Sequence, residues 1–253
     1  MLMTDKVLLV GRGPLMVEAV RFFEGKGVHV LPLETATYRE SAEVTAVVDV
    51  MSGPLEEKMK DLREAEALVA KNVPIFSSVL RYMATRIAAG LKGPERLVGF
   101  SPLLLEEGEV LEASRPLQAE EDASWDRHLR LWERWGKRVE ILGDEPGLVF
   151  PRTLALMVNE AAWILTEGGA DRRDIDTAMK KGTNHPFGPL EWADQIGVDQ
   201  VLAILEGLQE ELGDDRYRPA PFLRRMVYAG RLGESTGQGF HRYETVKAGD
   251  GHA

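Results

Sequence analysis

The chain has 253 residues, of which 44% are hydrophobic and 28% are charged, and its formal net charge is −10. The acidic balance argues against sequence-blind nucleic-acid binding, which depends on a basic face, and the absence of cysteine excludes disulfides, thiolate catalysis and thiolate metal sites. No apolar segment reaches the roughly 20 residues of a membrane-spanning helix, and the start of the chain lacks a signal-peptide pattern, so we expect a cytoplasmic globular protein with no membrane or nucleic-acid partner.

Residues 6–144 alternate short apolar runs with helical stretches, which is the pattern of a parallel sheet covered by helices. Amphipathic helices are predicted over 14–27, 56–71 and 123–137, and the first of them is expected to bury Val17. The indoles of residues 123–137 lie near one helical stripe and are expected in the core. The runs that predict strands are 6–11, 28–34, 46–51, 74–80, 95–102, 109–114 and 138–143.

Helical patterns alone follow the segment Asp144 to Gly147, whose glycine and proline are typical of a domain junction. We therefore expect an α/β chain made of two domains: a parallel-sheet domain over 1–144 and an all-helical domain over 145–253, whose long apolar helix is typical of a dimer interface. The predicted helices of the second domain cover 148–169, 172–182, 188–213 and 220–233.

A glycine turn, Gly11-x-Gly13, directly follows the first predicted strand and opens a helix, and Glu34 ends the second strand about 20 residues on. In this dinucleotide-binding layout Gly11 makes the turn, Gly13 lets the pyrophosphate approach the backbone, and Glu34 accepts from the adenine ribose, which favours NAD over NADP. Met16 stands where the pattern has a small residue that lets the helix pack closely on the strand. Its side chain must therefore either push the helix away from the strand or turn outwards. Pro14 removes one amide. The other interpretation is a strand-to-helix turn that no longer holds a nucleotide.

Three phrases of the second half resemble the 3-hydroxyacyl-CoA dehydrogenases: "DEPGLVFPRTLALMVNEA", "DIDTAMKKGTNHPFGPLEWADQIGVD" and "FLRRMVYAGRLGESTGQGFHRY". The resemblance extends from about Lys6 to Tyr243. It implies a Rossmann domain joined to a helical domain that forms a homodimer. It also implies NAD-dependent interconversion of 3-hydroxyacyl-CoA and 3-ketoacyl-CoA, as in fatty-acid metabolism.

The resemblance also implies site residues. Ser77 or Ser78 falls where the family has a serine that holds the substrate oxygen, and Glu112 matches the glutamate that orients the catalytic histidine. His185, the one histidine inside a family motif, is the candidate for a replacement base. No cluster of aspartate, glutamate and histidine residues has the spacing of metal ligands, so we expect no metal.

Three positions depart from the family. Val98 stands where the family has its histidine, Ser101 and Pro102 replace the Asn-Pro that follows, and Pro151 replaces an asparagine. Residues 35–45 are also too short for the helical pair with which the family helps to hold CoA.

Two functions remain open at this point. One is a compact dehydrogenase of the family, with acyl-CoA-like substrates and with Glu112 and a serine in surviving roles. The other is a catalytically inactive family member that keeps the fold and the dimer and acts as a nucleotide-binding, acyl-CoA-binding or partner protein.

Overall fold

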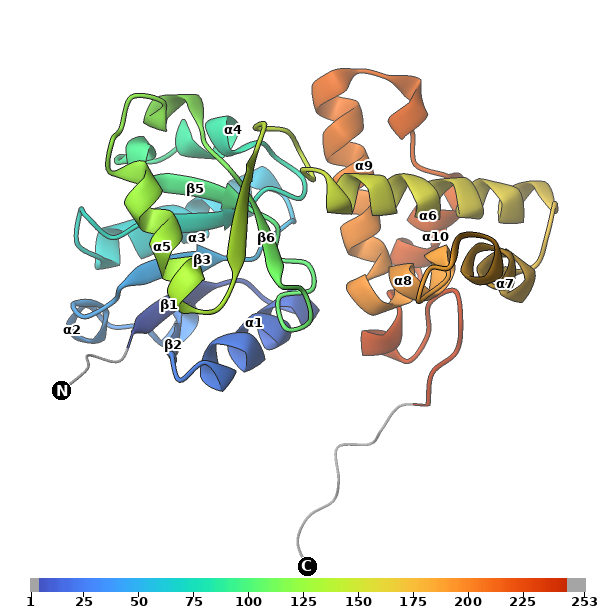
Figure 1. Cartoon of the computed structure of the whole chain (residues 1–253), viewed down its shortest axis with the longest axis horizontal. Coiled ribbons are helices and arrows are strands. Elements are labelled where there is room, and N and C mark those ends of the chain that lie inside the picture. Colours follow the sequence, from blue (N-terminus) through green and yellow to red (C-terminus); the bar gives the residue numbers. More distant parts are fainter. Residues whose placement is uncertain (1–4, 245–253) are drawn as a thin grey trace, which may run out of the picture. The chain divides into compact units, whose positions relative to one another are not determined.

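The computed structural model describes residues 5–244, and the chain divides into two compact units (Figure 1). The sheet unit ends at Pro151 and the helical unit begins at Arg152. The division lies seven residues beyond the expected junction at Asp144, because the segment between these points hydrogen-bonds to the sheet. Gly147 N–H, for example, donates to the carbonyl of Val79 at 2.7 Å.

The sheet unit is built on one seven-stranded sheet in the order β2-β1-β3-β4-β5-β6-β7. β6 runs antiparallel to β5, and the other neighbouring pairs are parallel. Every strand predicted from an apolar run is present. The strands are β1 (Lys6–Val10), β2 (His29–Pro32), β3 (Ala46–Asp49), β4 (Ile75–Ser78), β5 (Leu97–Phe100), β6 (Val110–Ser114) and β7 (Arg138–Leu142).

Five helices accompany this sheet: α1 (Pro14–Gly25), α2 (Tyr38–Ser41), α3 (Leu55–Leu68), α4 (Ala84–Ala88) and α5 (Trp125–Arg134). α1 buries the stripe Leu15, Ala19 and Phe23, whereas Val17 is 50% exposed, so the expected burial of Val17 is wrong. Two residues along a helix are about 200° apart, which turns Val17 away from the face that Leu15 buries. Between β2 and β3 lie only a short 3-10 helix (Leu33–Thr35) and the four-residue α2, in agreement with the shortened segment.

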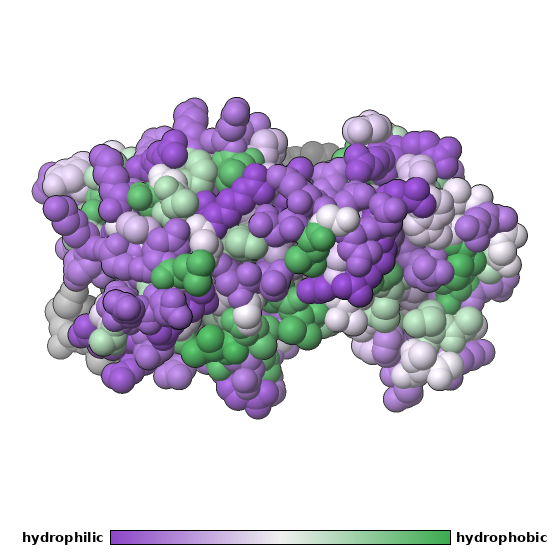
Figure 2. All heavy atoms as spheres, turned by 90° about the horizontal axis from the view of Figure 1, so that it is seen from above, coloured by the Kyte–Doolittle hydropathy of each residue, from purple (hydrophilic) through white to green (hydrophobic). Residues whose placement is uncertain are grey.

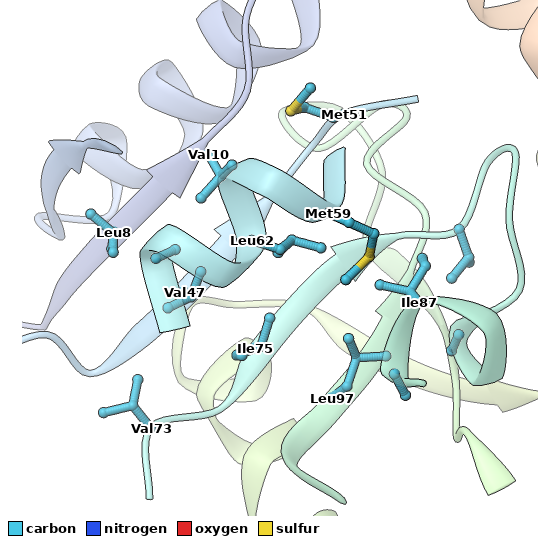
Figure 3. Packing of buried hydrophobic residues seen from close by; sticks show 14 of the residues in the cluster. Leu8, Val10, Val47, Met51, Met59, Leu62, Val73, Ile75, Ile87 and Leu97 are labelled. Atoms are coloured by element: carbon cyan, nitrogen blue, oxygen red, sulfur yellow. The ribbon is translucent and has the colours of Figure 1, made fainter. Parts of the chain in front are cut away.

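The core fills both faces of the sheet. On one face Val47 and Ile75 pack against Met59 and Leu62 of α3, as Figure 3 shows. The other face is aromatic, since the ring of Trp132 on α5 lies 5.4 Å from Phe76 and 5.2 Å from Phe100. The three indoles predicted to be core are buried: Trp125, Trp132 and Trp135 are each at most 2% exposed.

The helical unit contains α6 (Phe150–Glu167, which begins in the last residues of the sheet unit), α7 (Arg172–Thr183), α8 (Pro189–Ile196), α9 (Val198–Leu212) and α10 (Pro221–Tyr228). Asp171 caps α7 as expected, accepting from Asp174 N–H. The segment after α10 is held by the buried Asp194, which accepts from the backbone N–H groups of Phe240 and His241.

Hydrophilic residues cover most of the face seen in Figure 2, and hydrophobic residues form separate patches on it. Between residues 5 and 244, none of the helices combines the length and apolarity needed to span a membrane.

Candidate functional site

The glycine turn lies at the carboxyl end of β1, beside β3. Gly11 has φ 148°, and a β-carbon there would lie 2.6 Å from Cγ2 of Val50, so a side chain does not fit. Gly13, with φ 75°, is the N-cap of α1, and a β-carbon built on it would meet nothing within 4 Å. The turn therefore presents open backbone at a helix N-terminus, which suits a phosphate group.

A cavity of about 270 Å³ adjoins this turn and is lined by Gly11, Arg12, Met16 and Glu34, among others. Met16 is half-buried and faces this cavity, so of the two expected outcomes the outward turn is the one observed. Arg12 pairs with Asp61 of α3 at 3.0 Å.

Three carboxylates line this first cavity, because Asp61 and Glu64 of α3 join Glu34. Arg12 offsets one of these charges through its pair with Asp61, and the negative charge that remains disfavours an additional phosphate near Glu34. The open glycine turn and the acidic wall thus fit NAD better than NADP.

A second cavity, of about 300 Å³, lies where β5 ends and β6 begins. Its walls are mainly apolar and include Leu103, Leu104, Val110 and Phe150. Its polar side chains include Ser101 and Glu112, together with Glu109 on the exposed side. An apolar cavity with a few convergent polar groups is the usual form of a small-molecule site.

Ser101 and Glu112 lie directly opposite each other across β5 and β6. The register pairs Phe100 with Ala113, and Ser101 N–H donates to the carbonyl of Glu112 at 3.1 Å. Opposed residues of an antiparallel pair share one face of the sheet, and their β-carbons lie about 5 Å apart. The hydroxyl and the carboxylate therefore enter the second cavity side by side.

The carboxylate of Glu112 also holds the start of α6. It accepts from Val149 N–H at 3.1 Å and from Phe150 N–H at 2.9 Å. Ser101 Oγ accepts from Leu103 N–H at 3.4 Å. Both polar side chains of this pair are thus fixed by backbone contacts.

The structure places Val98 on the face of β5 opposite to that of Ser101. Val98 is fully buried and shares its side of β5 with Phe100, which packs against Trp132 on the aromatic face. Side chains alternate between faces along a strand, so Val98 points away from the second cavity. If Glu112 orients the catalytic group, the position next to it is Ser101. The sequence carries no signal for this serine, because its position opposite Glu112 depends on the register between β5 and β6.

The serines expected at the site are both buried. Ser77 Oγ donates to Asp49 Oδ2 at 2.6 Å, and Asp49 Oδ2 also accepts from Lys58 Nζ at 2.5 Å. Burial lowers the pKa of Lys58, and the Asp49 carboxylate opposes that shift. Ser78 is 1% exposed, and its Oγ has no hydrogen-bond partner among the described residues. Neither serine lines the cavity that holds Ser101 and Glu112.

His185 belongs to the helical unit, where its ring lies 5.6 Å from that of Trp192. No histidine lines either of the two cavities described above. Between residues 5 and 244, no group of three or more histidine, cysteine, aspartate or glutamate side chains is arranged to hold a metal ion.

Comparison with known proteins identifies the family. The model of the 3-hydroxyacyl-CoA dehydrogenase C-terminal domain matches residues 147–243. The chain is 35% identical to a probable 3-hydroxybutyryl-CoA dehydrogenase of Bacillus subtilis, over 82% of its own length and 72% of that protein. A 3-hydroxybutyryl-CoA dehydrogenase of Bradyrhizobium diazoefficiens is 36% identical over 81% of the chain and 70% of that protein. The crystal structure of an (S)-3-hydroxybutyryl-CoA dehydrogenase from Ralstonia eutropha superimposes with a TM-score of 0.73 at 28% identity, covering 95% of this chain and 99% of that one. The chain therefore belongs to the 3-hydroxyacyl-CoA dehydrogenase family.

Proposed function

We propose that the protein is an NAD-dependent oxidoreductase that interconverts 3-hydroxyacyl-CoA and 3-ketoacyl-CoA, with Ser101 and Glu112 at the reacting oxygen. The observation that supports this most is the entry of these two opposed side chains into one apolar cavity of about 300 Å³. The relatives bear names for this reaction and match most of the chain.

NAD, when bound, accepts the hydride from the hydroxyl-bearing carbon. Gly13 and the N-terminus of α1 would hold the pyrophosphate, and Gly11 keeps the backbone close to β3. Glu34 would accept hydrogen bonds from the adenine ribose, and the negative charge of the lining, which Arg12 offsets only in part, would disfavour a 2′-phosphate.

The proton of the substrate hydroxyl moves to the Ser101–Glu112 pair. Ser101 Oγ hydrogen-bonds to the substrate oxygen, takes its proton and passes its own proton to the carboxylate of Glu112 beside it. Carboxylates ordinarily titrate well below neutral pH and are weaker bases than imidazole. Because a well-matched base contributes about 10²- to 10⁴-fold, we expect a slow dehydrogenase.

A second candidate is the inactive family member that binds a nucleotide or an acyl-CoA without turnover. Its support is that the Glu112 carboxylate already caps α6 through Val149 and Phe150, and that no histidine lines the cavity. In this case the carboxylate stabilises the fold and accepts no proton.

The two candidates separate in an assay of NADH oxidation with acetoacetyl-CoA at high protein concentration. If the protein is a dehydrogenase, it oxidises NADH in this assay. The rate then falls at least tenfold in both Ser101→Ala and Glu112→Gln, while the affinity for NADH, measured by fluorescence titration, stays unchanged. Ser77→Ala is the control, since Ser77 lies outside the cavity. NADH binding without any rate in the parent protein would reject catalysis and leave the second candidate.

The oligomeric state and the cellular location of the protein are also proposals. We propose a homodimer formed through the helical unit, which exposes Phe187, Leu212 and Tyr228, and a cytoplasmic protein of acyl-CoA metabolism. Light scattering that finds only monomer at micromolar concentration would contradict the dimer.

A further inference from the structure

The wall of the second cavity is a loop, residues 102–109, that connects β5 to β6. It places Leu103, Leu104 and Gly108 in the lining. Leu104 has φ 57°, a left-handed conformation that bulky residues rarely adopt. The carbonyl of Leu104 accepts from Gly108 N–H at 2.8 Å, which closes the loop into a tight turn. Such a turn keeps its shape only where its surroundings hold it.

Lys137 holds this loop through two backbone carbonyls. Its Nζ donates to the carbonyl oxygens of Leu105 and Gly108, and its side chain is buried. The ammonium also lies 4.8 Å from the centre of the Phe22 ring, a cation–π arrangement. Burial lowers the pKa of Lys137. Hydrogen bonds from a charged donor are about twice as strong as neutral ones.

Glu18 also holds the loop, beside Lys137, because Glu18 and Phe22 are one turn apart on the same face of α1. Its Oε1 accepts from Glu106 N–H at 3.4 Å, and the amide of Leu105 also lies within its reach. Glu18 belongs to α1, whose N-terminus carries the glycine turn. The helix of the nucleotide site therefore also supports the wall of the second cavity.

Resting on the proposed function, we propose that Glu18 and Lys137 are positioning residues that fix the size of the acyl-binding cavity by clamping residues 102–109. Neither side chain lines the cavity. Together they satisfy backbone donors and acceptors on the outer side of the loop, so that Leu104 is pressed inward against the substrate. This rigid wall selects short acyl groups over long ones.

The kinetic test uses Lys137→Met, which keeps the stem and removes the ammonium, and Glu18→Met, which keeps the stem and removes the acceptor oxygens. Loss of a charged hydrogen bond predicts about a tenfold rise or more in KM for acetoacetyl-CoA, with KM for NADH and kcat within about twofold. The preference for acetoacetyl-CoA over a 3-ketooctanoyl ester should narrow by a similar factor, and Lys137→Arg should restore part of it. Lys26→Met is the matched control, because Lys26 also lies over Phe22 at 5.9 Å but is exposed. The proposal would be overturned if kcat fell while the KM values for acetoacetyl-CoA and for NADH both rose. An unchanged preference for acetoacetyl-CoA over the 3-ketooctanoyl ester would also overturn it.

A second measurement does not depend on turnover. Amide hydrogen exchange in the peptide that contains residues 102–109 should be at least tenfold faster in Lys137→Met than in the parent, while exchange in β1 stays unchanged. If the parent protein has no activity but the loop is loosened and acyl-CoA binding weakens in this variant, the catalytic proposal fails and the clamp stands. Equal exchange rates in the parent and in Lys137→Met would reject the clamp whatever the activity.

Discussion

Replacing Ser101 by histidine should increase the rate of acetoacetyl-CoA reduction, because it places a base with a pKa near neutrality beside Glu112. The position is suited to the change. Ser101 is 7% exposed, lines a cavity of about 300 Å³, and is paired with Glu112 across two strands. An imidazole there displaces no core side chain, since it extends into the cavity.

The size of the increase follows from the hydrogen bonds of the carboxylate. Glu112 Oε2 accepts from the N–H groups of Val149 and Phe150, at 3.1 and 3.2 Å, whereas Oε1 accepts only from Phe150, at 2.9 Å. A carboxylate oxygen has two lone pairs, so Oε1 retains one for an imidazole N–H. A positioned base is worth about 10²- to 10⁴-fold, and we expect the lower value because the carboxylate remains shared with the backbone.

The assay is NADH oxidation in the parent, Ser101→His and Val98→His at equal NADH saturation. Val98→His is the informative control, because that side chain lies on the aromatic face and is fully buried. It should lower the free energy of unfolding by about 1–3 kcal/mol through overpacking and give no gain in rate. A folded Ser101→His protein that binds NADH but reacts no faster than the parent would refute the assignment, as would any acceleration in Val98→His.

Three further predictions concern the sheet unit. Glu34→Ser should shift the ratio of NADPH to NADH affinity by about tenfold toward NADPH in fluorescence titrations, since a nearby carboxylate repels the 2′-phosphate; an unchanged ratio would move the ribose site elsewhere. Lys58→Met should cost about 3–5 kcal/mol in urea unfolding, because it leaves Asp49 buried without its counter-charge, and adding Asp49→Asn should recover part of that loss rather than add to it. Burial raises the pKa of Glu66, but hydrogen bonds from two backbone amides and Arg96 outweigh it and lower the pKa overall. Its contribution to stability is therefore present above the ordinary carboxylate pKa and is lost as the pH falls through the lowered value, so Glu66→Gln should flatten the acid limb of a stability–pH curve measured by urea unfolding.

Most of the fold could be predicted from the sequence, because burial on both faces leaves a continuous apolar run at each central strand. β1 and β3 are examples, with Val7 to Val10 and Ala46 to Val48 all inaccessible to solvent. The buried face of α1 was harder to predict. Val17 is apolar but points outward, and only the position of the sheet decides which stripe of a helix is covered.

The site was predicted less completely, because it depends on register between strands. Matching the Ser-Pro pair to the family's Asn-Pro placed the catalytic position at Val98, one strand face away from Glu112. The sequence alone does not state how β5 pairs with β6, and an odd-numbered slip exchanges the two faces. The surroundings of Ser77 could not be predicted for a different reason, because its hydroxyl is held by the buried Asp49, whose pairing with Lys58 has no sequence motif.

The packing of Trp132 against Trp135, with ring centres 5.1 Å apart and planes at 84°, gives the protein an optical signature. Two indoles at this separation couple their electronic transitions, so the sheet unit should show an exciton couplet in circular dichroism. Trp163 and Trp192 belong to the helical unit. One chain therefore carries a spectroscopic label for each half, and loss of the couplet reports melting of the sheet unit without any added dye.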